Sequence, residues 1–125
     1  MLFIGIHATW DVYNCNTEKL SFVPYIKKSL HKITATLDLE ELNEAFKQFE
    51  PVGVTGFILL AESHISIHTW PEHNYVAVDV FSCKAFDTAV VTSLLKELFE
   101  SDQITLNQLN RGELKLAQKA NFLAK

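Results

Sequence analysis

Cysteine is scarce in this sequence, which contains only Cys15 and Cys83. Two cysteines are too few for the disulfide framework of a small secreted domain. We therefore expect a cytoplasmic protein in a reducing setting, with each thiol either buried or reactive. The first residues also lack the basic segment of a secretory signal peptide, and Asp11 interrupts the apolar run early, so no signal peptide is expected.

Long apolar segments are missing as well. The longest stretch without Asp, Glu, Lys or Arg is Pro51–Ala61, which is eleven residues long. A helix that crosses a bilayer needs about 20 mainly apolar residues. We therefore expect no contact with a membrane.

Clustered positive charge is absent too. The chain has 11 Lys and Arg against 15 Asp and Glu, with a formal net charge of −4, and Lys27–Lys28 is the only adjacent basic pair. Proteins that bind nucleic acids neutralise phosphates with groups of basic side chains. We therefore expect no nucleic-acid partner.

No linker rich in Pro, Gly or Ser and no internal repeat divides the 125 residues. This length suits one ordinary domain, so we expect a single domain over residues 1–125. The hydrophobic content of 48% supports a real core and is high enough to be compatible with a surface that a partner subunit covers.

Hydrophobic spacing predicts several strands and two helices. A helix is expected to follow Thr17, its predicted N-cap, with Pro24 in an early turn or splitting it; a second is expected over 87–100, capped by Asp87. Residues 39–50 fit either a helix or a strand, and 111–125 are weakly patterned. The predicted strands are 2–9, 56–61, 63–69, 75–83 and 103–109. Consecutive strands with helices packed to one side predict an α+β, two-layer domain.

The stretch between Glu62 and Trp70 alternates almost perfectly between polar and apolar residues, as a half-buried strand does. Its polar face is unusual because it holds small hydroxyls, imidazoles and an aromatic ring instead of full charges. Such a face suits a binding pocket better than open solvent. The residues on it are His64, Ser66, His68 and Trp70.

Two kinds of site fit this stretch poorly. On a strand, His64 and His68 would lie about 13 Å apart, too far to share a zinc ion, and His73 beyond the turn could join only one of them. No Gly-x-Ser-x-Gly elbow is present for a serine hydrolase. A triad of Ser63 or Ser66 with His68 and Asp79 could still assemble across strands, although nothing local requires it.

The run "AESHISIHTWPEHNYVAVDVFSC" resembles the signature of the prokaryotic S-adenosylmethionine decarboxylase proenzymes. That signature has Glu-Ser-His at a cleavage point, then IHTWPE, then a Tyr-x-Ala-x-Asp-x-Phe-x-Cys strand. The likeness is dense over residues 49–83, including "FEPVGVTG", looser in "GIHATWDVYNCN", and slight after about residue 85. The family is pyruvoyl-dependent and makes this cofactor from an internal serine, without pyridoxal phosphate or a metal.

The resemblance implies self-cleavage between Glu62 and Ser63. The Ser63 hydroxyl would attack the Glu62 carbonyl, and elimination would leave the chains 1–62 and 63–125, the second beginning with a pyruvoyl group that forms a Schiff base with the substrate. His68 matches the residue that assists elimination. Cys83 matches the general acid that returns a proton to the product.

The resemblance also implies substrate contacts. Phe49 corresponds to the residue that stacks on adenine, and Glu72 to the carboxylate that holds the ribose. Thr55 stands where the family usually has a serine thought to assist processing, so we expect slower processing. Other departures are Lys84 in place of the usual glycine, Lys47 where histidine is frequent, and an atypical Glu50.

These likenesses imply an α+β two-layer sandwich with a mainly antiparallel sheet, helices on one face, and pairing as a homodimer whose sites draw on both protomers. The implied activity is decarboxylation of S-adenosylmethionine for spermidine and other polyamines. Because the departures cluster around the substrate, two alternatives stay open: a decarboxylase of ornithine or arginine on the same fold, and a non-catalytic regulatory paralogue. Activation by putrescine is left open.

Strand geometry adds one constraint. Ser63 and His68 are separated by five positions, so on a regular strand they would point to opposite faces. They can share a site only if the chain bends, bulges or is cut near Ser63.

Overall fold

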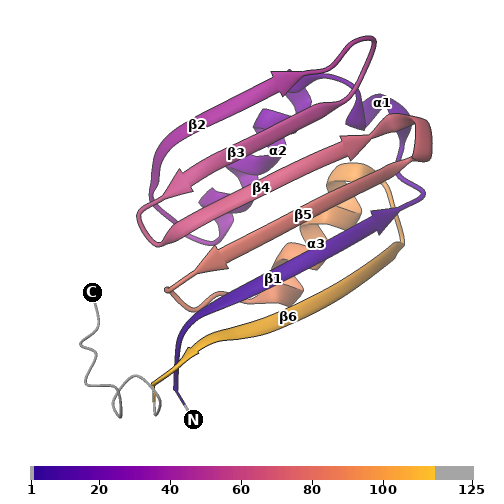
Figure 1. Cartoon of the computed structure of the whole chain (residues 1–125). Helices are drawn as coiled ribbons and strands as arrows, with labels where there is room; N and C mark the ends of the chain where they lie inside the picture. Colours follow the sequence, from indigo (N-terminus) through magenta and orange to yellow (C-terminus); the bar gives the residue numbers. More distant parts are fainter. Residues whose placement is uncertain (1, 115–125) are drawn as a thin grey trace.

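A six-stranded sheet with helices on one side forms the protein in a computed structural model that describes residues 2–114 (Figure 1). The strand order is β2-β3-β4-β5-β1-β6, and every neighbouring pair is antiparallel. In chain order the elements are β1 (Phe3–Tyr13), α1 (Thr17–Leu20), α2 (Val23–Thr36), β2 (Glu41–Gln48), β3 (Val54–Leu60), β4 (Ser63–Trp70), the 3₁₀ turn η1 (Pro71–His73), β5 (Tyr75–Ser82), α3 (Thr88–Phe99) and β6 (Gln103–Glu113). The predicted α+β class, the mainly antiparallel sheet and the helices on one face are confirmed.

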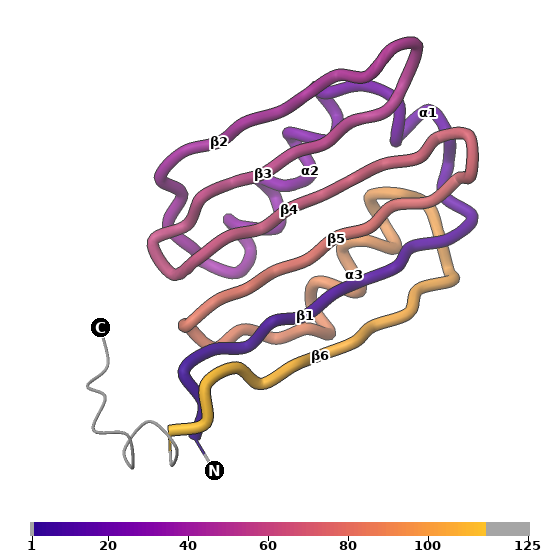
Figure 2. Tube along the Cα trace, in the orientation of Figure 1, coloured from indigo at the N-terminus to yellow at the C-terminus, as the bar shows by residue number. Residues whose placement is uncertain are grey.

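The two ends of the described chain meet at one edge of the sheet. Figure 2 shows β1 lying between β5 and β6, although β6 follows it by almost the whole chain. Both β1 and β6 extend further toward the C-terminus than predicted. The part of the weakly patterned tail that the structure describes, Arg111–Glu113, completes β6, and residues 115–125 lie outside the described part of the chain.

The first helical region is split, as Pro24 allowed. The chain breaks between α1 and α2, and Pro24 lies in the first turn of α2, where its missing N–H costs no helical hydrogen bond. The prediction of Thr17 as the N-cap is wrong by one residue. Asn16 is the N-cap, because its backbone is extended and its side-chain oxygen accepts a hydrogen bond from the Glu18 amide at 3.0 Å. The predicted cap of α3, Asp87, is confirmed and accepts from the Ala89 amide.

The ambiguous segment 39–50 contains a strand, β2, at one edge of the sheet. After α2 ends, Asp38 takes a left-handed backbone with φ of 55° and turns the chain back toward β3. The apolar spacing that also fitted a helix is overruled by pairing with β3, which satisfies the backbone groups of β2 along one side.

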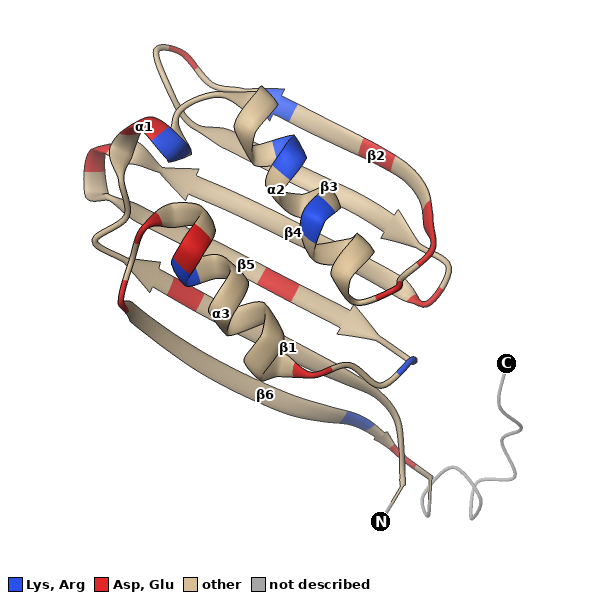
Figure 3. Cartoon of the chain, turned by 180° about the vertical axis from the view of Figure 1, so that it is seen from behind, with Lys and Arg blue, Asp and Glu red and all other residues tan. Residues whose placement is uncertain are grey.

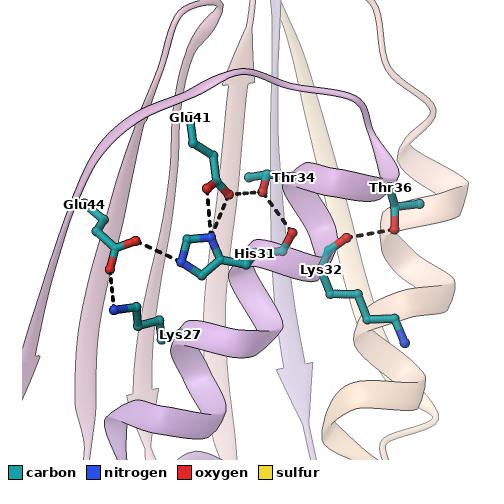
Figure 4. A network of polar contacts seen from close by, with 7 residues as sticks. All are labelled: Lys27, His31, Lys32, Thr34, Thr36, Glu41 and Glu44. Carbon is teal, nitrogen blue, oxygen red and sulfur yellow. Dashed lines mark hydrogen bonds and ion pairs between the residues drawn. The ribbon is translucent and has the colours of Figure 1, made fainter.

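A polar cluster ties this edge strand to the helix layer (Figure 4). One ring nitrogen of His31 on α2 lies 2.8 Å from the Glu41 carboxylate and the other lies 2.8 Å from the Glu44 carboxylate. Lys27 forms an ion pair with Glu44 at 2.8 Å, and the Thr34 hydroxyl donates to Glu41. The hydrogen bond from Lys27 and the charges of Lys27 and His31 hold the pKa of Glu44 below its ordinary value.

The hydrophobic core lies between the sheet and the helices. Alternate residues of the central strands, such as Ile65 and Ile67 of β4 and Val78 of β5, point into it, and the indole of Trp10 donates to Thr92 of α3 at 2.8 Å. Figure 3 shows α2 and α3 lying over the sheet, with the basic residues of α2 on the helix layer. No helix in the described chain is both long and apolar enough to cross a membrane.

No helix within residues 2–114 lies over the opposite face of the sheet (Figure 1). That side carries the polar face that the alternation in 63–70 predicted, together with large apolar side chains left exposed: Phe57, Leu59, Trp70 and Leu109 are between 39% and 59% exposed. We call this the open face, meaning the face of the sheet that carries these four residues and His64, Ser66 and His68.

Candidate active site

The predicted cleavage point lies in a tight hairpin. Leu60 at the end of β3 pairs with Ser63 at the start of β4, so only Ala61 and Glu62 form the loop. Ser63 has a φ of 146°, in a region that favours glycine. A serine held there is strained, and the strain falls on the residue whose nitrogen belongs to the Glu62–Ser63 peptide.

The carbonyl of this peptide is already hydrogen-bonded. The backbone N–H of Cys83 donates to the Glu62 carbonyl oxygen at 2.9 Å. Sheet register creates this contact, because Ser63 pairs with Ser82 and so places Cys83 beside the hairpin loop. An N–H aimed at a carbonyl oxygen stabilises the negative charge that develops there when a nucleophile attacks.

The Cys83 thiol lies at the same end of the sheet. Cys83 directly follows β5 and is an exposed free cysteine, with a hollow of about 180 Å³ beside it. The first residues of β1, among them Phe3 and Gly5, form the other wall of this hollow. Glu62, Ser63 and Cys83 therefore form one group, which we call the cleavage group.

The remaining predicted residues gather at the other end of the strands. Phe49, Thr55, His68 and Glu72 line a cavity of about 280 Å³, together with Trp70 and Gly53. Thr55 and His68 are directly paired across β3 and β4, and the Thr55 hydroxyl lies 3.1 Å from Nδ1 of His68. We call these four residues the pocket group.

Each member of the pocket group has a clear structural support. Phe49 follows β2 and is 46% exposed, while its amide donates to the Gly53 carbonyl at 2.8 Å. Glu72 lies in the exposed 3₁₀ turn after β4, where the left-handed Asn74 reverses the chain into β5. The His68 ring lies 6.2 Å from the Trp70 ring. An exposed aromatic face and a carboxylate over one cavity suit a ligand with an aromatic base and vicinal hydroxyls.

The two groups do not meet within one protomer. Ser63 and His68 belong to the same strand, and five residues of strand span about 16 Å. The positive φ of Ser63 leaves this separation in place, because Ser63 stays in register with Leu60 and Ser82. The structure therefore brings together Glu62, Ser63 and Cys83, and separately Phe49, Thr55, His68 and Glu72.

A polar network in the middle of the open face was not found from the sequence. The Asp79 carboxylate lies 2.7 Å from Nε2 of His7 and 3.2 Å from Nε2 of His64, and it also accepts from the Ser66 hydroxyl. Burial raises the pKa of the Asp79 carboxyl, but the hydrogen bonds from Ser66, His7 and His64 outweigh it and hold this pKa below its ordinary value. The alternation in β1 and β5 could have indicated that His7 and Asp79 share this face.

Three members of this network, His7, His64 and Asp79, are of types that bind metal ions. The donor atoms of His7, His64 and Asp79 lie within 4.8 Å of one another. However, an Arg111 guanidinium nitrogen lies 3.2 Å from Nδ1 of His7, and since arginine can only donate, the ring proton of His7 is on Nε2, the nitrogen that would bind the ion. The positive charge of Arg111 also opposes a cation here. The geometry favours a hydrogen-bonded network.

Two further groups bear on the site. The Tyr75 hydroxyl donates to Asp11. Burial is the larger cause and this hydrogen bond the second cause that raise the Tyr75 pKa well above its ordinary value. Cys15 is buried, and loss of solvation raises the pKa of its thiol to about 11. Its thiol is therefore far less reactive than one exposed to solvent. Of the two thiols, only Cys83 is both exposed and near the cleavage point.

Comparison with known proteins places these features in context. Residues 6–112 match the family model described as S-adenosylmethionine decarboxylase. An S-adenosylmethionine decarboxylase proenzyme of Clostridium botulinum is 36% identical over 115 residues, covering 91% of this chain and 99% of that protein. One from Sulfurihydrogenibium is 48% identical over 80 residues, covering 64% of this chain and 60% of the relative.

Solved structures agree with the sequence comparison. The crystal structure of the adenosylmethionine decarboxylase from Aquifex aeolicus superposes with a TM-score of 0.83 at 32% sequence identity. The match covers 90% of this chain and 94% of that one.

Proposed function

Because the chain belongs to the S-adenosylmethionine decarboxylase family, we propose that it is a proenzyme that cuts itself between Glu62 and Ser63 and then decarboxylates S-adenosylmethionine. The product would supply aminopropyl groups for spermidine and other polyamines. The observation that carries the proposal is the strained Ser63 beside a carbonyl already held by the Cys83 amide. The single domain would then consist of the chains 1–62 and 63–125.

The cleavage step follows from the groups at the hairpin. The Ser63 hydroxyl oxygen attacks the Glu62 carbonyl carbon, the amide bond breaks, and an ester to the Ser63 oxygen forms in its place. Loss of the Ser63 α-proton then breaks the bond between Cβ and that oxygen, which leaves with Glu62 as a new carboxylate. The dehydroalanine left at position 63 takes up water and releases ammonia, which gives the pyruvoyl group. The Cys83 amide stabilises the oxyanion in the first step, and His68 is assigned the proton in the second.

The residues at the cleavage point fit the pyruvoyl group that the family uses. Its precursor, Ser63, lies next to an exposed thiol and a hollow, where a substrate amine can approach. A pyruvoyl group supplies an electrophilic carbonyl that binds the substrate amine and accepts the electrons left when CO₂ departs. We assign to the Cys83 thiol the return of a proton to the product, a task that requires a free, reduced cysteine and is consistent with a reducing cytoplasm.

We further propose that the working site forms between two copies of the chain. Each protomer holds the cleavage group and the pocket group at opposite ends of the same strands. A twofold axis running across the strands would lay two open faces together and bring the cleavage group of one copy to the pocket group of the other. The exposed apolar side chains of the open face support this pairing, since they would be buried by it.

S-adenosylmethionine suits the pocket group. Phe49 would stack on the adenine, Glu72 would hold the ribose hydroxyls, and the aromatic Trp70 would attract the sulfonium with about 0.5–2 kcal/mol. Ornithine and arginine are smaller and have neither an adenine for Phe49 nor ribose hydroxyls for Glu72. They serve as the comparison substrates.

The test is release of labelled CO₂ from carboxyl-labelled S-adenosylmethionine by the cleaved protein. Release from S-adenosylmethionine, with little from ornithine or arginine, is the expected result. The Ser63→Ala variant should remain uncut and release none. Release from ornithine or arginine, with none from S-adenosylmethionine, would show that the proposed substrate is wrong. A cut protein that releases CO₂ from none of the three would contradict the proposed decarboxylation.

A further inference from the structure

The short segment Asp38–Glu40, between α2 and β2, contacts both sides of the cleavage point. Its central residue, Leu39, is 7% exposed and anchors the segment in the core, and the Leu39 amide donates to the Thr34 carbonyl at 3.0 Å. The residues on either side of Leu39 face the loops that hold the Glu62–Ser63 peptide. We call Asp38–Glu40 the bracket.

On one side the bracket holds the hairpin loop. The Ala61 amide donates to the Glu40 carbonyl at 2.9 Å, and the Glu40 amide donates to a carboxylate oxygen of Glu62, Oε1, at 3.0 Å. Both backbone groups of Glu40 are therefore used by the loop. The Glu62 side chain points into the bracket, where it accepts an N–H.

On the other side the bracket holds the strand end that contacts the Glu62 carbonyl. Nζ of Lys84 donates to the Asp38 carbonyl at 2.6 Å, and the Lys84 amide donates to the Ser82 hydroxyl at 3.0 Å. Cys83 lies between these two anchors, and its amide is the group that donates to the Glu62 carbonyl.

From this geometry we propose that Glu62 is a positioning residue for self-cleavage, acting through the Glu40 amide, and that Lys84 supports the same contact from the opposite side. The inference rests on the proposed function and deepens it. The Glu62 carboxylate holds the loop so that its own carbonyl stays on the Cys83 amide while Ser63 attacks. Lys84, which stands where the resemblance leads one to expect glycine, ties the Cys83 loop to the bracket.

A positioning role differs from a proton-transfer role in a way that two variants separate. Glu62→Gln keeps an oxygen that can accept the Glu40 N–H but cannot exchange a proton near neutral pH. Glu62→Ala removes the acceptor. We expect self-cleavage of Glu62→Gln within about twofold of the parent rate and with the same pH profile, and cleavage of Glu62→Ala about tenfold slower, the loss expected for one hydrogen bond.

Lys84 has a matched control in Asp38. Lys84→Met removes the ammonium group and should slow cleavage by about threefold, as expected for a contact that is largely exposed. Asp38→Asn should have no effect, because Lys84 donates to the backbone carbonyl of Asp38 and lies 3.4 Å from a carboxylate that is 99% exposed.

Hydrogen exchange tests the same contacts without relying on cleavage. In an uncut Ser63→Ala background, Glu62→Ala should speed amide exchange at Glu40 and Cys83, whereas Glu62→Gln should leave both protected. Unchanged protection in Glu62→Ala, or a Glu62→Gln variant that cleaves as slowly as Glu62→Ala, would overturn the inference. A parent chain that never cuts itself would contradict the proposed function, while the exchange result would still decide the role of Glu62.

Discussion

Ser63 and His68 lie on one strand, β4, and the strand carries them to opposite ends of the protomer. The distance along five residues of strand is about 16 Å, well beyond proton-transfer reach. The His68 ring contacts the Thr55 hydroxyl and lines the cavity of the pocket group. This cavity lies at the opposite end of the strands from Cys83. A site that uses both residues must therefore draw on two protein chains.

Mixed dimers test this sharing of sites. Co-expressed Ser63→Ala and His68→Ala chains should regain activity, because one of the two sites in each mixed dimer would combine an intact Ser63 with an intact His68. With random pairing half of the dimers are mixed, so the unfractionated mixture recovers about a quarter of the parent activity and the purified mixed dimers about half, while each variant alone is inactive. The measurement is CO₂ release by purified mixed dimers carrying two different tags. Inactive mixed dimers would show that His68 does not reach Ser63 across an interface.

Cys83 allows cleavage and turnover to be separated. Its contact with the Glu62 carbonyl uses the backbone amide, which Cys83→Ala retains, whereas the proposed proton donation uses the thiol. We expect Cys83→Ala to cut itself within about twofold of the parent rate and to lose about a hundredfold in decarboxylation, the lower range for loss of a general acid. Cleavage is followed by gel and turnover by CO₂ release. Full turnover in Cys83→Ala would remove the thiol from the mechanism.

Thr55 is predicted to act through its hydroxyl oxygen. Thr55→Val has nearly the same shape but cannot hydrogen-bond to Nδ1 of His68, so we expect self-cleavage about tenfold slower. Thr55→Ser keeps the oxygen without the extra methyl group and should cleave at least as fast as the parent. Time courses of fragment formation give the rates. Equal rates for the valine and serine variants would mean that the hydroxyl is dispensable.

Asp79 links stability to pH. Its pKa is held below the ordinary value of about 3.9, so its contribution to stability is present above that value and is lost as the pH falls through the pKa of the folded protein. Asp79→Asn should lower the free energy of unfolding by about 1–3 kcal/mol at pH 7. Below pH 4 the free energy of unfolding of the variant should fall less steeply with pH than that of the parent. Denaturant unfolding from pH 7 to pH 3 measures both effects. A variant with the parent's stability and the parent's pH slope would show that the network on the open face contributes nothing.

The polar cluster that ties β2 to α2 through Lys27, His31 and Glu44 should respond to acid in the same direction as Asp79. The hydrogen bond from Lys27, with the charges of Lys27 and His31, lowers the pKa of Glu44, so the contact persists above the ordinary pKa of about 4.3 and weakens as the pH drops through the folded value. Glu44→Gln should have a lower melting temperature than the parent at pH 7. The difference between the two melting temperatures should become smaller near pH 4. The test is thermal unfolding of both proteins across this range. A gap that widens toward pH 4 would contradict the assignment.

Much of the fold could be predicted because strand and helix patterns dominate the sequence. The strict alternation of β4 and β5 predicted which residues face the core, and Asp87 predicted the start of α3. Residues 39–50 were ambiguous because their apolar spacing fits a helix as well as an edge strand. Pairing with β3 decided the outcome, and pairing depends on residues distant in the sequence.

The site was only partly predictable for a related reason. The resemblance identified individual residues, and alternation indicated that Ser63 and His68 could not share a regular strand face. The contact of the Cys83 amide with the Glu62 carbonyl depends on the register of β4 and β5, and the bracket depends on how α2 returns to the sheet. The backbone groups that take part, among them the amides of Glu40 and Cys83, leave no mark in the types of residue that carry them.

The most direct test of the account is the intact mass of the purified chain. We predict two fragments, 1–62 and a 63–125 chain that begins with a pyruvoyl group in place of serine, and a single uncut chain for Ser63→Ala. A parent protein that stays full-length after long incubation, or a Ser63→Ala variant that is still cut at this peptide, would contradict it.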